Sequence, residues 1–459
     1  MSGLSRRKFF AATAGLSCTV GAGLAAGCAS GPRSARSSNA PSSDTKSVLI
    51  IGAGMAGLAA ARGLVDAGWP VRVIEARARI GGRVHTNRDW GVPVEMGASW
   101  IHGTTDNPLV DLAHKAAAQL ASTDYDSPAK LAIDPRLQPI TYDESTWRQL
   151  VAEARGEVDG GSLGAAIDAA ATREELSEAE RAELAYYVNT VIEDEYAADS
   201  DQLSATTFDR GNYSDGPQVV VTTGYDALPR SLADGLSIVL NAAVNTVVRK
   251  DNSVLVRAGD QSFEGPAAIV TVPLGVLKAG SITFDPPLPD GHRQAVTALG
   301  FGALSKSYFR FPRRTWDVEN AFYQYLGSDT LWAQWLTLPA AAGPIVLAFN
   351  SGHRGRSVES GSPAELMASA LPVARQLFGD DIAPVEVRSS RWTIDPYALG
   401  SYSFHATGSG LDDRRRLQEP IGDRLYLAGE AVAVDNPGTV HGALLSGRSA
   451  ATELMRRLG

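Results

Sequence analysis

Residues 47–75 constrain the fold of this chain more than any other segment. The apolar run 47–51 predicts a short strand, and the glycine-rich sequence GAGMAG follows it at once. An alanine-rich helix is predicted at 58–66, and a second predicted strand at 71–75 ends in an acid. Glycines in such a strand–turn–helix permit a tight turn and a close approach to pyrophosphate, which the helix N-terminus attracts. The pattern predicts a dinucleotide site, rather than a turn without a ligand, held by Gly52, Gly54, Ala56, Gly57 and Glu75.

The residues that follow Glu75 distinguish an FAD site from an NAD site. Arg77 comes first, and Arg79-Ile80-Gly81-Gly82-Arg83 follows, in which Arg83 can bind phosphate through two parallel hydrogen bonds. This run resembles the R-x-G-G-R extension of the flavin amine oxidase family, which lies along the FAD diphosphate. The resemblance covers about residues 48–458 and includes polyamine oxidases, monoamine oxidases and flavin histone demethylases. It implies FAD as the cofactor.

Cysteine use limits how the FAD can be held. The two cysteines, Cys18 and Cys28, both precede the dinucleotide segment, so no cysteinyl flavin link, thiolate nucleophile or cysteine metal site can form after residue 28. We therefore expect noncovalent FAD and no metal. The net charge of −9, from 42 Lys and Arg against 51 Asp and Glu, disfavours a nucleic-acid partner.

Signature segments farther along the chain carry the rest of the expected FAD site. Residues 239–244 predict a strand whose Val244 meets the adenine in the family, and residues 425–430 predict a strand that ends in Glu430. The resemblance also implies that a final helix starting at Thr439 points its N-terminus at the flavin ring. Besides the glycine-rich run, the implied cofactor residues are Arg77, Gly82, Arg83, Gly97, Ala98, Ser99, Trp100, Val244, Trp392, Gly429, Glu430, Thr439 and Val440.

These separated segments predict an interleaved α/β fold. A Rossmann-like FAD-binding domain of the GR2, or p-hydroxybenzoate-hydroxylase-like, type is expected from residues 47–115, 216–290 and 396–459. An α+β substrate-binding domain is expected from residues 116–215 and 291–395. In the second domain, residues 143–190 have a helical pattern, and residues 303–311 and 321–349 alternate like strands, which predicts an antiparallel sheet flanked by helices.

Lys306 is the first candidate catalytic residue. Alternation places it on the strand face of Leu304 and Tyr308, and a lysine there is costly unless it has a partner or a lowered pKa. In the family, the matching lysine binds a water beside flavin N5 and is implicated in flavin reoxidation. The alternative is an edge-strand lysine that extends to solvent.

Two aromatic residues are the next candidates. The resemblance matches Tyr402 to one member of the aromatic cage of monoamine oxidases, Thr439 to the position of the second member, and Ser401 to the flavin-linked cysteine. Such a half-open cage would admit a long amine. Trp392 is assigned to both catalysis and cofactor binding. The alternative for Tyr402 and Trp392 is that they are ordinary core aromatics.

His102 and Glu195 are the candidates for substrate binding, together with Tyr402 and Thr439. The segment around His102 resembles that of polyamine and spermine oxidases, whose matching histidine lines the amine channel. His102 is also a candidate catalytic residue. A turn-stabilising imidazole is the alternative. Glu195 lies in an acidic cluster, and the resemblance implies that it binds a distal ammonium, unless the cluster is a solvated loop.

The N-terminus predicts an export signal. Arg6 and Arg7 precede an uncharged run from 9 to 30, which resembles a twin-arginine signal; an ordinary signal or a short anchor is the alternative. Residues 25–28 resemble a lipobox with Cys28 as the lipidated residue; the alternative is that the signal is cleaved nearby without lipidation. Residues 31–46 predict a flexible linker. We therefore expect an extracytoplasmic, periplasmic protein with a lipid anchor at Cys28.

The resemblance implies oxidation of a polyamine or diamine as the activity. Hydride would pass from the carbon next to nitrogen to flavin N5, the imine would hydrolyse, and O2 would reoxidise the flavin and yield H2O2. No arginine follows His102 at the place where L-amino-acid oxidases bind the α-carboxylate, which favours a plain amine. The alternatives are an L-amino-acid or monoamine oxidase, a carotenoid or porphyrin desaturase, and a flavoprotein without catalysis.

Overall fold

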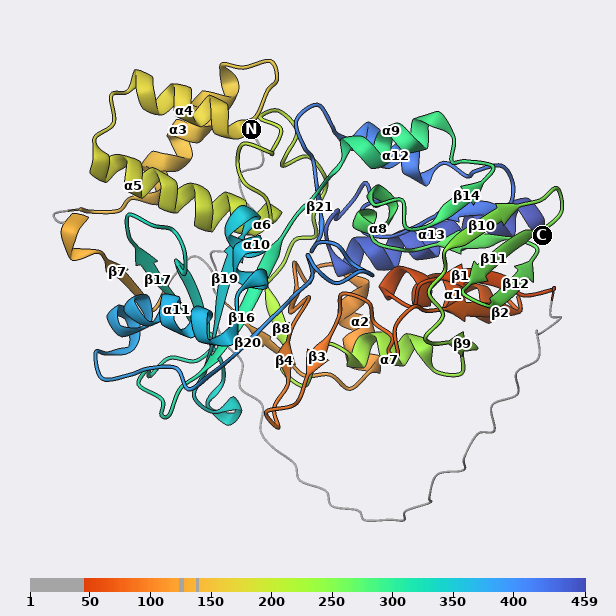
Figure 1. The fold of residues 1–459 in the computed structure, drawn as a ribbon, viewed down its shortest axis with the longest axis horizontal. Coiled ribbons are helices and arrows are strands. Elements are labelled where there is room, and N and C mark those ends of the chain that lie inside the picture. Colours follow the sequence, from red (N-terminus) through yellow and green to blue (C-terminus); the bar gives the residue numbers. More distant parts are fainter. Residues whose placement is uncertain (1–44, 124–127, 138–139) are drawn as a thin grey trace, which may run out of the picture.

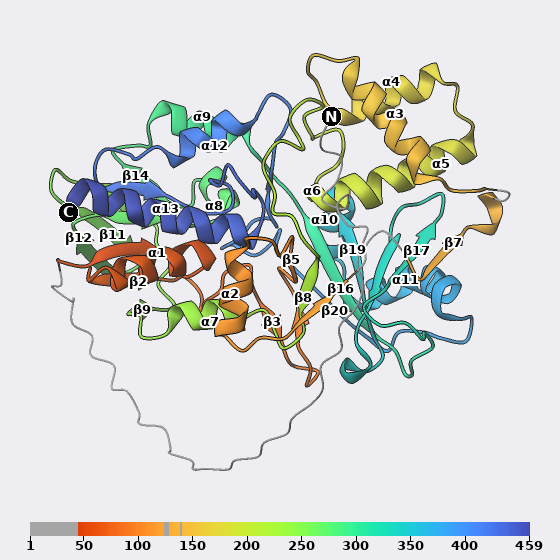
Figure 2. The ribbon, with the colours of Figure 1, turned by 180° about the vertical axis from the view of Figure 1, so that it is seen from behind.

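A computed structural model describes residues 45–123, 128–137 and 140–459, which form two lobes lying side by side (Figures 1 and 2). The predicted export signal, Cys28 and nearly all of the predicted linker lie outside the described residues. Within the described ranges, no helix combines the length and the apolar character needed to cross a bilayer.

The first lobe is built on a parallel sheet of five strands in the order β22-β13-β1-β2-β9, with every neighbouring pair parallel. The bounds are Val48–Ile51 (β1), Val71–Ile74 (β2), Ile238–Val239 (β9), Ala268–Val270 (β13) and Leu425–Leu427 (β22). The predicted strand over 239–244 is wrong in its extent. Strand β9 ends at Val239 because Asn241 has a left-handed φ of 57°, which an extended strand does not allow.

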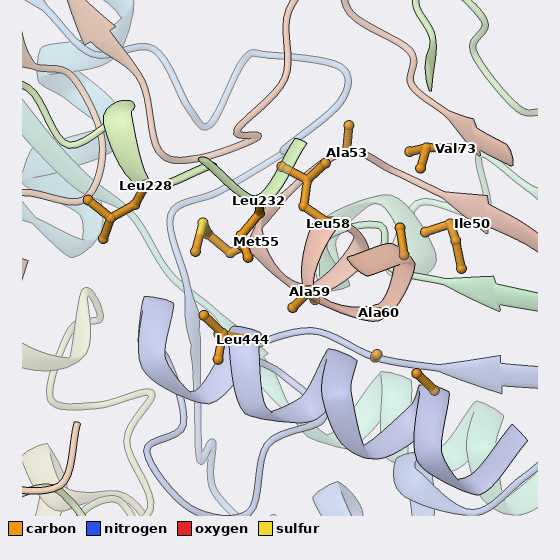
Figure 3. Packing of buried hydrophobic residues seen from close by; sticks show 14 of the residues in the cluster. Ile50, Ala53, Met55, Leu58, Ala59, Ala60, Val73, Leu228, Leu232 and Leu444 are labelled. Atoms are coloured by element: carbon orange, nitrogen blue, oxygen red, sulfur yellow. The ribbon is translucent and has the colours of Figure 1, made fainter. Parts of the chain in front are cut away.

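Both faces of this sheet are covered. Ile50 belongs to a buried cluster that also contains residues of helices α1 (Met55–Asp66), α7 (Ala227–Ala233) and α13 (Val440–Leu458), part of which Figure 3 shows. Small residues let α1 and α13 approach closely, since a Cβ on Gly447 would lie 2.0 Å from the Ala56 carbonyl oxygen. Ile51 packs on the other side toward a four-stranded sheet in the order β12-β11-β10-β14. That sheet comprises Thr246–Arg249 (β10), Val254–Ala258 (β11), Gln261–Gly265 (β12) and Thr283–Asp285 (β14).

The second lobe contains a six-stranded sheet in the order β20-β16-β19-β18-β17-β7, antiparallel except for the β17–β7 pair. Its bounds are Lys130–Ile133 (β7), Leu304–Arg310 (β16), Phe322–Leu326 (β17), Gln334–Thr337 (β18), Ile345–Ser351 (β19) and Glu386–Ser389 (β20). Helix α11 (Pro363–Phe378) packs on one face, over an aromatic core that includes Phe309, Trp332 and Trp335. The opposite face carries Tyr308 and Phe349, which pack with Trp100 of the first lobe.

The predicted helical region 143–190 forms separate helices because it contains capping residues. Ser162 caps α4 (Leu163–Arg173), and Ser177 forms a capping box with Glu180 at the start of α5 (Glu178–Tyr187). The remaining helix here is α3 (Glu144–Gly156), capped by Asp143. After α5 the backbone continues as a π-helix, η2 (Val188–Glu193), and one short turn, α6 (Asp194–Tyr196).

The remaining elements are shorter. The strands are Thr86–Asn87 (β3), Val94–Glu95 (β4), Trp100–Ile101 (β5), Leu120–Ser122 (β6), Val219–Val221 (β8), Gly300–Phe301 (β15) and Ser403–Phe404 (β21). The helices are Pro108–Lys115 (α2), Leu274–Lys278 (α8), Asp290–Ala298 (α9), Gly352–Ser360 (α10) and Leu411–Gln418 (α12), with 3₁₀ turns at Pro135–Leu137 (η1) and Ala340–Ala342 (η3). Helix α9 packs against α12 and shares the core of the first lobe.

Candidate active site

A cavity of about 780 Å³ is lined by residues of both lobes. Of the residues singled out from the sequence as site residues, Gly57 alone does not line it. Gly57 serves the turn itself, since a Cβ there would lie 1.9 Å from the Gly52 carbonyl oxygen. The structure therefore brings into one space the lining residues Gly52, Gly54, Ala56, Glu75, Arg77, Gly82, Arg83, Gly97, Ala98, Ser99, Trp100, His102, Glu195, Val244, Lys306, Trp392, Tyr402, Gly429, Glu430, Thr439 and Val440.

The glycine-rich turn forms an open cradle at the N-terminus of α1. Gly52 has a φ of 104°, and a Cβ on Gly54 would meet no atom within 4 Å. Glu75 follows β2, and its carboxylate accepts hydrogen bonds from the Ala53 amide at 2.7 Å and from the Arg77 amide at 2.9 Å. The backbone amides and the helix dipole at this place suit a phosphate group. These residues fit a dinucleotide.

An ion pair with a buried carboxylate lies beside a second glycine cradle. Gly429 has a φ of 145° and open space where a Cβ would project. Glu430 next to it pairs with Arg83 at 2.8 Å and accepts a hydrogen bond from the Ser403 hydroxyl at 2.6 Å. Burial alone would raise the pKa of Glu430, but the charge of Arg83 and these hydrogen bonds outweigh it and lower the pKa. Glu430 thus stays an acceptor and fixes Arg83 beside the cavity.

Lys306 lines the cavity from a strand that is not at a sheet edge. Strand β16 runs between β20 and β19, and the Lys306 side chain is 4 % exposed, so the solvent-extended alternative is wrong. Its Nζ donates to the Gly97 carbonyl at 2.6 Å and to the Ser99 hydroxyl at 2.5 Å. The same Nζ lies 5.1 Å from the centroid of the Trp100 ring. Burial lowers the pKa of Lys306, and the charge of Glu95 opposes this only in part.

The aromatic candidates are anchored by their polar atoms. The Trp392 indole N–H donates to the Met96 carbonyl at 2.8 Å. The Tyr402 hydroxyl lies 3.0 Å from the Asp194 carbonyl oxygen and 3.2 Å from that of Glu195, so it is held against α6. Thr439 lines the cavity, but its hydroxyl accepts the Gly442 amide at 2.9 Å and caps α13. This cap agrees with a final helix that begins at Thr439.

The substrate-binding candidates approach the cavity from different segments. His102 Nδ1 lies 2.8 Å from Gln218 Oε1, and this assignment leaves Nε2 of a neutral ring as an acceptor. Its ring stacks near Trp100, with centroids 6.5 Å apart. Glu195 lines the cavity directly after the π-helix η2, and Ala197 ends this turn with a left-handed φ of 55°. π-Helical turns often occur at functional sites.

The acidic residues of the cluster around Glu195, which lie between positions 193 and 201, do not share one role. Glu193 pairs with Arg354 at 3.0 Å, and Asp199 accepts the His353 amide at 3.0 Å, so both hold α10 in place. Asp194 lines the cavity next to Glu195. The solvated-loop alternative is therefore wrong for Glu195, which is only partly exposed.

Sequence reasoning missed other residues of the site. Gln334, Phe322 and Phe349 line the cavity through side chains of the second-lobe sheet. Glu95, two residues before the Gly97 that binds Lys306, is buried and accepts hydrogen bonds from the Thr86 hydroxyl and the Tyr225 amide. Burial raises the pKa of Glu95. An acid within the apolar run VPVEMGASW was the signal that could have revealed it.

The parallel sheet, the two glycine cradles and the buried lysine on one cavity define a dinucleotide-dependent oxidoreductase. Residues 55–455 match the model of the flavin-containing amine oxidoreductase family. Polyamine oxidase 2 of Arabidopsis thaliana is 33 % identical over 439 residues, which is 90 % of this chain and 88 % of that protein. Lysine-specific histone demethylase 1 homolog 1 of Oryza sativa subsp. japonica is 32 % identical over 91 % of this chain but only 53 % of its own length.

A solved structure of a putrescine oxidase with bound putrescine shares the fold. It superposes with a TM-score of 0.72 at 21 % identity and covers 90 % of this chain and 99 % of its own. The chain belongs to the flavin-containing amine oxidoreductase family, and FAD is its cofactor.

Proposed function

We propose that this protein oxidises a polyamine or diamine, with noncovalent FAD as the electron acceptor and O2 as the final oxidant. The observation that carries the proposal is one cavity that joins the dinucleotide cradles to Lys306 and to the acidic pair Asp194 and Glu195. A carboxylate remote from the reacting nitrogen attracts a second ammonium and orients the chain. The polyamine oxidases and the putrescine oxidase among the similar proteins support the same substrate class.

The positions of the side chains support the roles that we propose for them. When bound, FAD supplies an acceptor for the hydride from the carbon next to nitrogen, and oxygen then takes the electrons as H2O2 while water hydrolyses the imine. Lys306, whose pKa burial lowers, holds water at the cavity and exchanges a proton there. His102 accepts a hydrogen bond from the amine, and Tyr402, Trp392 and Thr439 line the reacting end.

A substrate panel tests this proposal. FAD-loaded protein is mixed without oxygen with spermine, spermidine, putrescine, tyramine or phenylalanine, and bleaching of the yellow flavin is recorded. We expect rapid bleaching by polyamines or putrescine, and H2O2 release once air is admitted. Bleaching by tyramine or phenylalanine alone would instead indicate a monoamine or L-amino-acid oxidase. A flavin that no amine bleaches would indicate a flavoprotein without this catalysis.

We further propose that the first lobe is a Rossmann-like FAD domain of the GR2 type and that the chain is exported. The order strand, glycine turn, helix and strand supports the domain type. The twin arginines and the residues before Cys28 support export and lipidation. Replacing both Arg6 and Arg7 by Lys should retain the protein in the cytoplasmic fraction, and Cys28→Ala should abolish labelling by a fatty acid.

A further inference from the structure

Glu359 is a buried carboxylate outside the cavity. It binds the residues next to two side chains that line the cavity, Lys306 and Trp392. Glu359 of α10 is 0 % exposed and does not line the cavity. One of its oxygens accepts hydrogen bonds from the Thr393 amide at 2.7 Å and the Thr393 hydroxyl at 2.6 Å. The other accepts the Ser390 hydroxyl at 2.9 Å. A carboxylate offers only acceptors, so it satisfies all three donors, which an amide side chain cannot do.

Each partner of Glu359 fixes the backbone of a cavity residue. The Ser390 hydroxyl oxygen accepts the Lys306 amide at 3.0 Å, and the Ser390 amide donates to the Lys306 carbonyl at 2.9 Å. Thr393 directly follows Trp392, whose carbonyl accepts the Gly400 amide at 2.9 Å. Glu359 therefore joins the strand that carries Lys306 to the turn that carries Trp392.

We propose that Glu359 is a positioning residue of the oxidase reaction, because it sets Lys306 and Trp392, which both line the cavity, relative to each other. The inference rests on the proposed function, since it assigns Glu359 an effect on that reaction. A displacement of about 1 Å at a reacting centre can slow a reaction about 10²-fold. Glu359 needs no contact with substrate or cofactor to have this effect.

The test compares Glu359→Gln with wild type as FAD-loaded protein. We expect FAD to stay bound, while reduction by amine and reoxidation by O2 each slow by about ten- to a hundredfold per bound flavin. Amide hydrogen exchange at Lys306 and Thr393 should become faster. The control is Glu183→Gln, because Glu183 is also buried but, among the residues that the structure describes, accepts only the Trp147 indole N–H at 3.1 Å and does not line the cavity. Its half-reactions should match wild type.

Two smaller changes separate the bond of Glu359 to Ser390 from its bonds to Thr393, and they remain informative if Glu359→Gln does not fold. Ser390→Ala removes the hydroxyl that bridges Glu359 and the Lys306 amide, keeps the backbone bond to the Lys306 carbonyl, and should reproduce the slow reoxidation. Thr393→Val removes one of the two bonds from Thr393 to Glu359 and should have a smaller effect. Protein reduced with dithionite reports reoxidation without any amine, so the inference is decided even if no amine is a substrate. A lower unfolding temperature with unchanged half-reactions and unchanged exchange at Lys306 would overturn it.

Discussion

At the scale of single residues, the site depends on charges that are buried and individually satisfied. Lys306 donates to a carbonyl and a hydroxyl rather than to a carboxylate, so burial lowers its pKa with little compensation. Alternation along the strand was enough to predict that the Lys306 side chain lies on the same face of the strand as Tyr308. The approach of Lys306 to Glu95 and Gly97 could not be predicted, because these residues lie some two hundred positions earlier in the chain.

Replacing Lys306 tests this residue directly. Lys306→Met keeps the length of the side chain but removes the amine, so we expect flavin reoxidation to slow by about 10²-fold or more while FAD stays bound. Rapid mixing of reduced protein with O2 measures the effect. The matched control is Lys278→Met, since Lys278 also donates to carbonyls, those of Val296, Thr297 and Leu299, but lies outside the cavity. Wild-type reoxidation in Lys306→Met would show that the lysine has no such role.

At the scale of elements, the strand, turn and helix at residues 48–66 form as their sequence predicts, because glycine, apolar and alanine patterns agree locally. The π-helix η2 follows from no such pattern, since its extra residue per turn depends on packing against the second-lobe sheet. The close contact of α1 with α13 was also hidden, because it joins the two ends of the described chain. Glycines at that contact determine how near the helices lie.

Two glycine substitutions with opposite expected effects on the free energy of unfolding test the contact between α1 and α13. Gly447→Ala places a Cβ where the Ala56 carbonyl oxygen lies, so we expect the free energy of unfolding to fall by about 1–3 kcal/mol and FAD affinity to weaken. Gly63→Ala meets only the Ala451 Cβ at 4.0 Å and should raise stability by about 0.4–1 kcal/mol. Denaturant unfolding measures both changes. Equal effects of the two substitutions would contradict the packing argument.

At the scale of the whole molecule, a buried network connects helix α12 to the segment between α6 and β8 through His405. His405 Nε2 accepts a hydrogen bond from Arg414 Nε at 2.8 Å, and its Nδ1 donates to the Thr207 carbonyl at 2.8 Å. Arginine cannot accept, so the ring must be neutral in the folded protein. Burial and the charge of Arg414 lower the pKa of His405 to about 4.

This network predicts loss of stability in acid. The unfolded chain binds a proton at His405 with the ordinary pKa of 6.5, whereas the folded chain does not until the pH approaches 4. The contribution of His405 to stability is therefore complete above pH 6.5 and should decline by about 3 kcal/mol as the pH falls from 6.5 toward 4. His405→Gln should flatten the pH dependence of unfolding, and His114→Gln, at an exposed position, should leave it unchanged. An identical slope in both variants would refute this assignment.

The order of the parallel sheet has a consequence for synthesis. Strand β22 and helix α13 come after every other described element, yet β22 pairs with β13 and α13 packs on α1, beside the first glycine turn. A growing chain that has not reached residue 430 has neither Glu430 nor the cap at Thr439. The flavin pocket can therefore be completed only after residues 425–458 have been synthesised and have folded onto elements made much earlier, and cofactor uptake must wait for them.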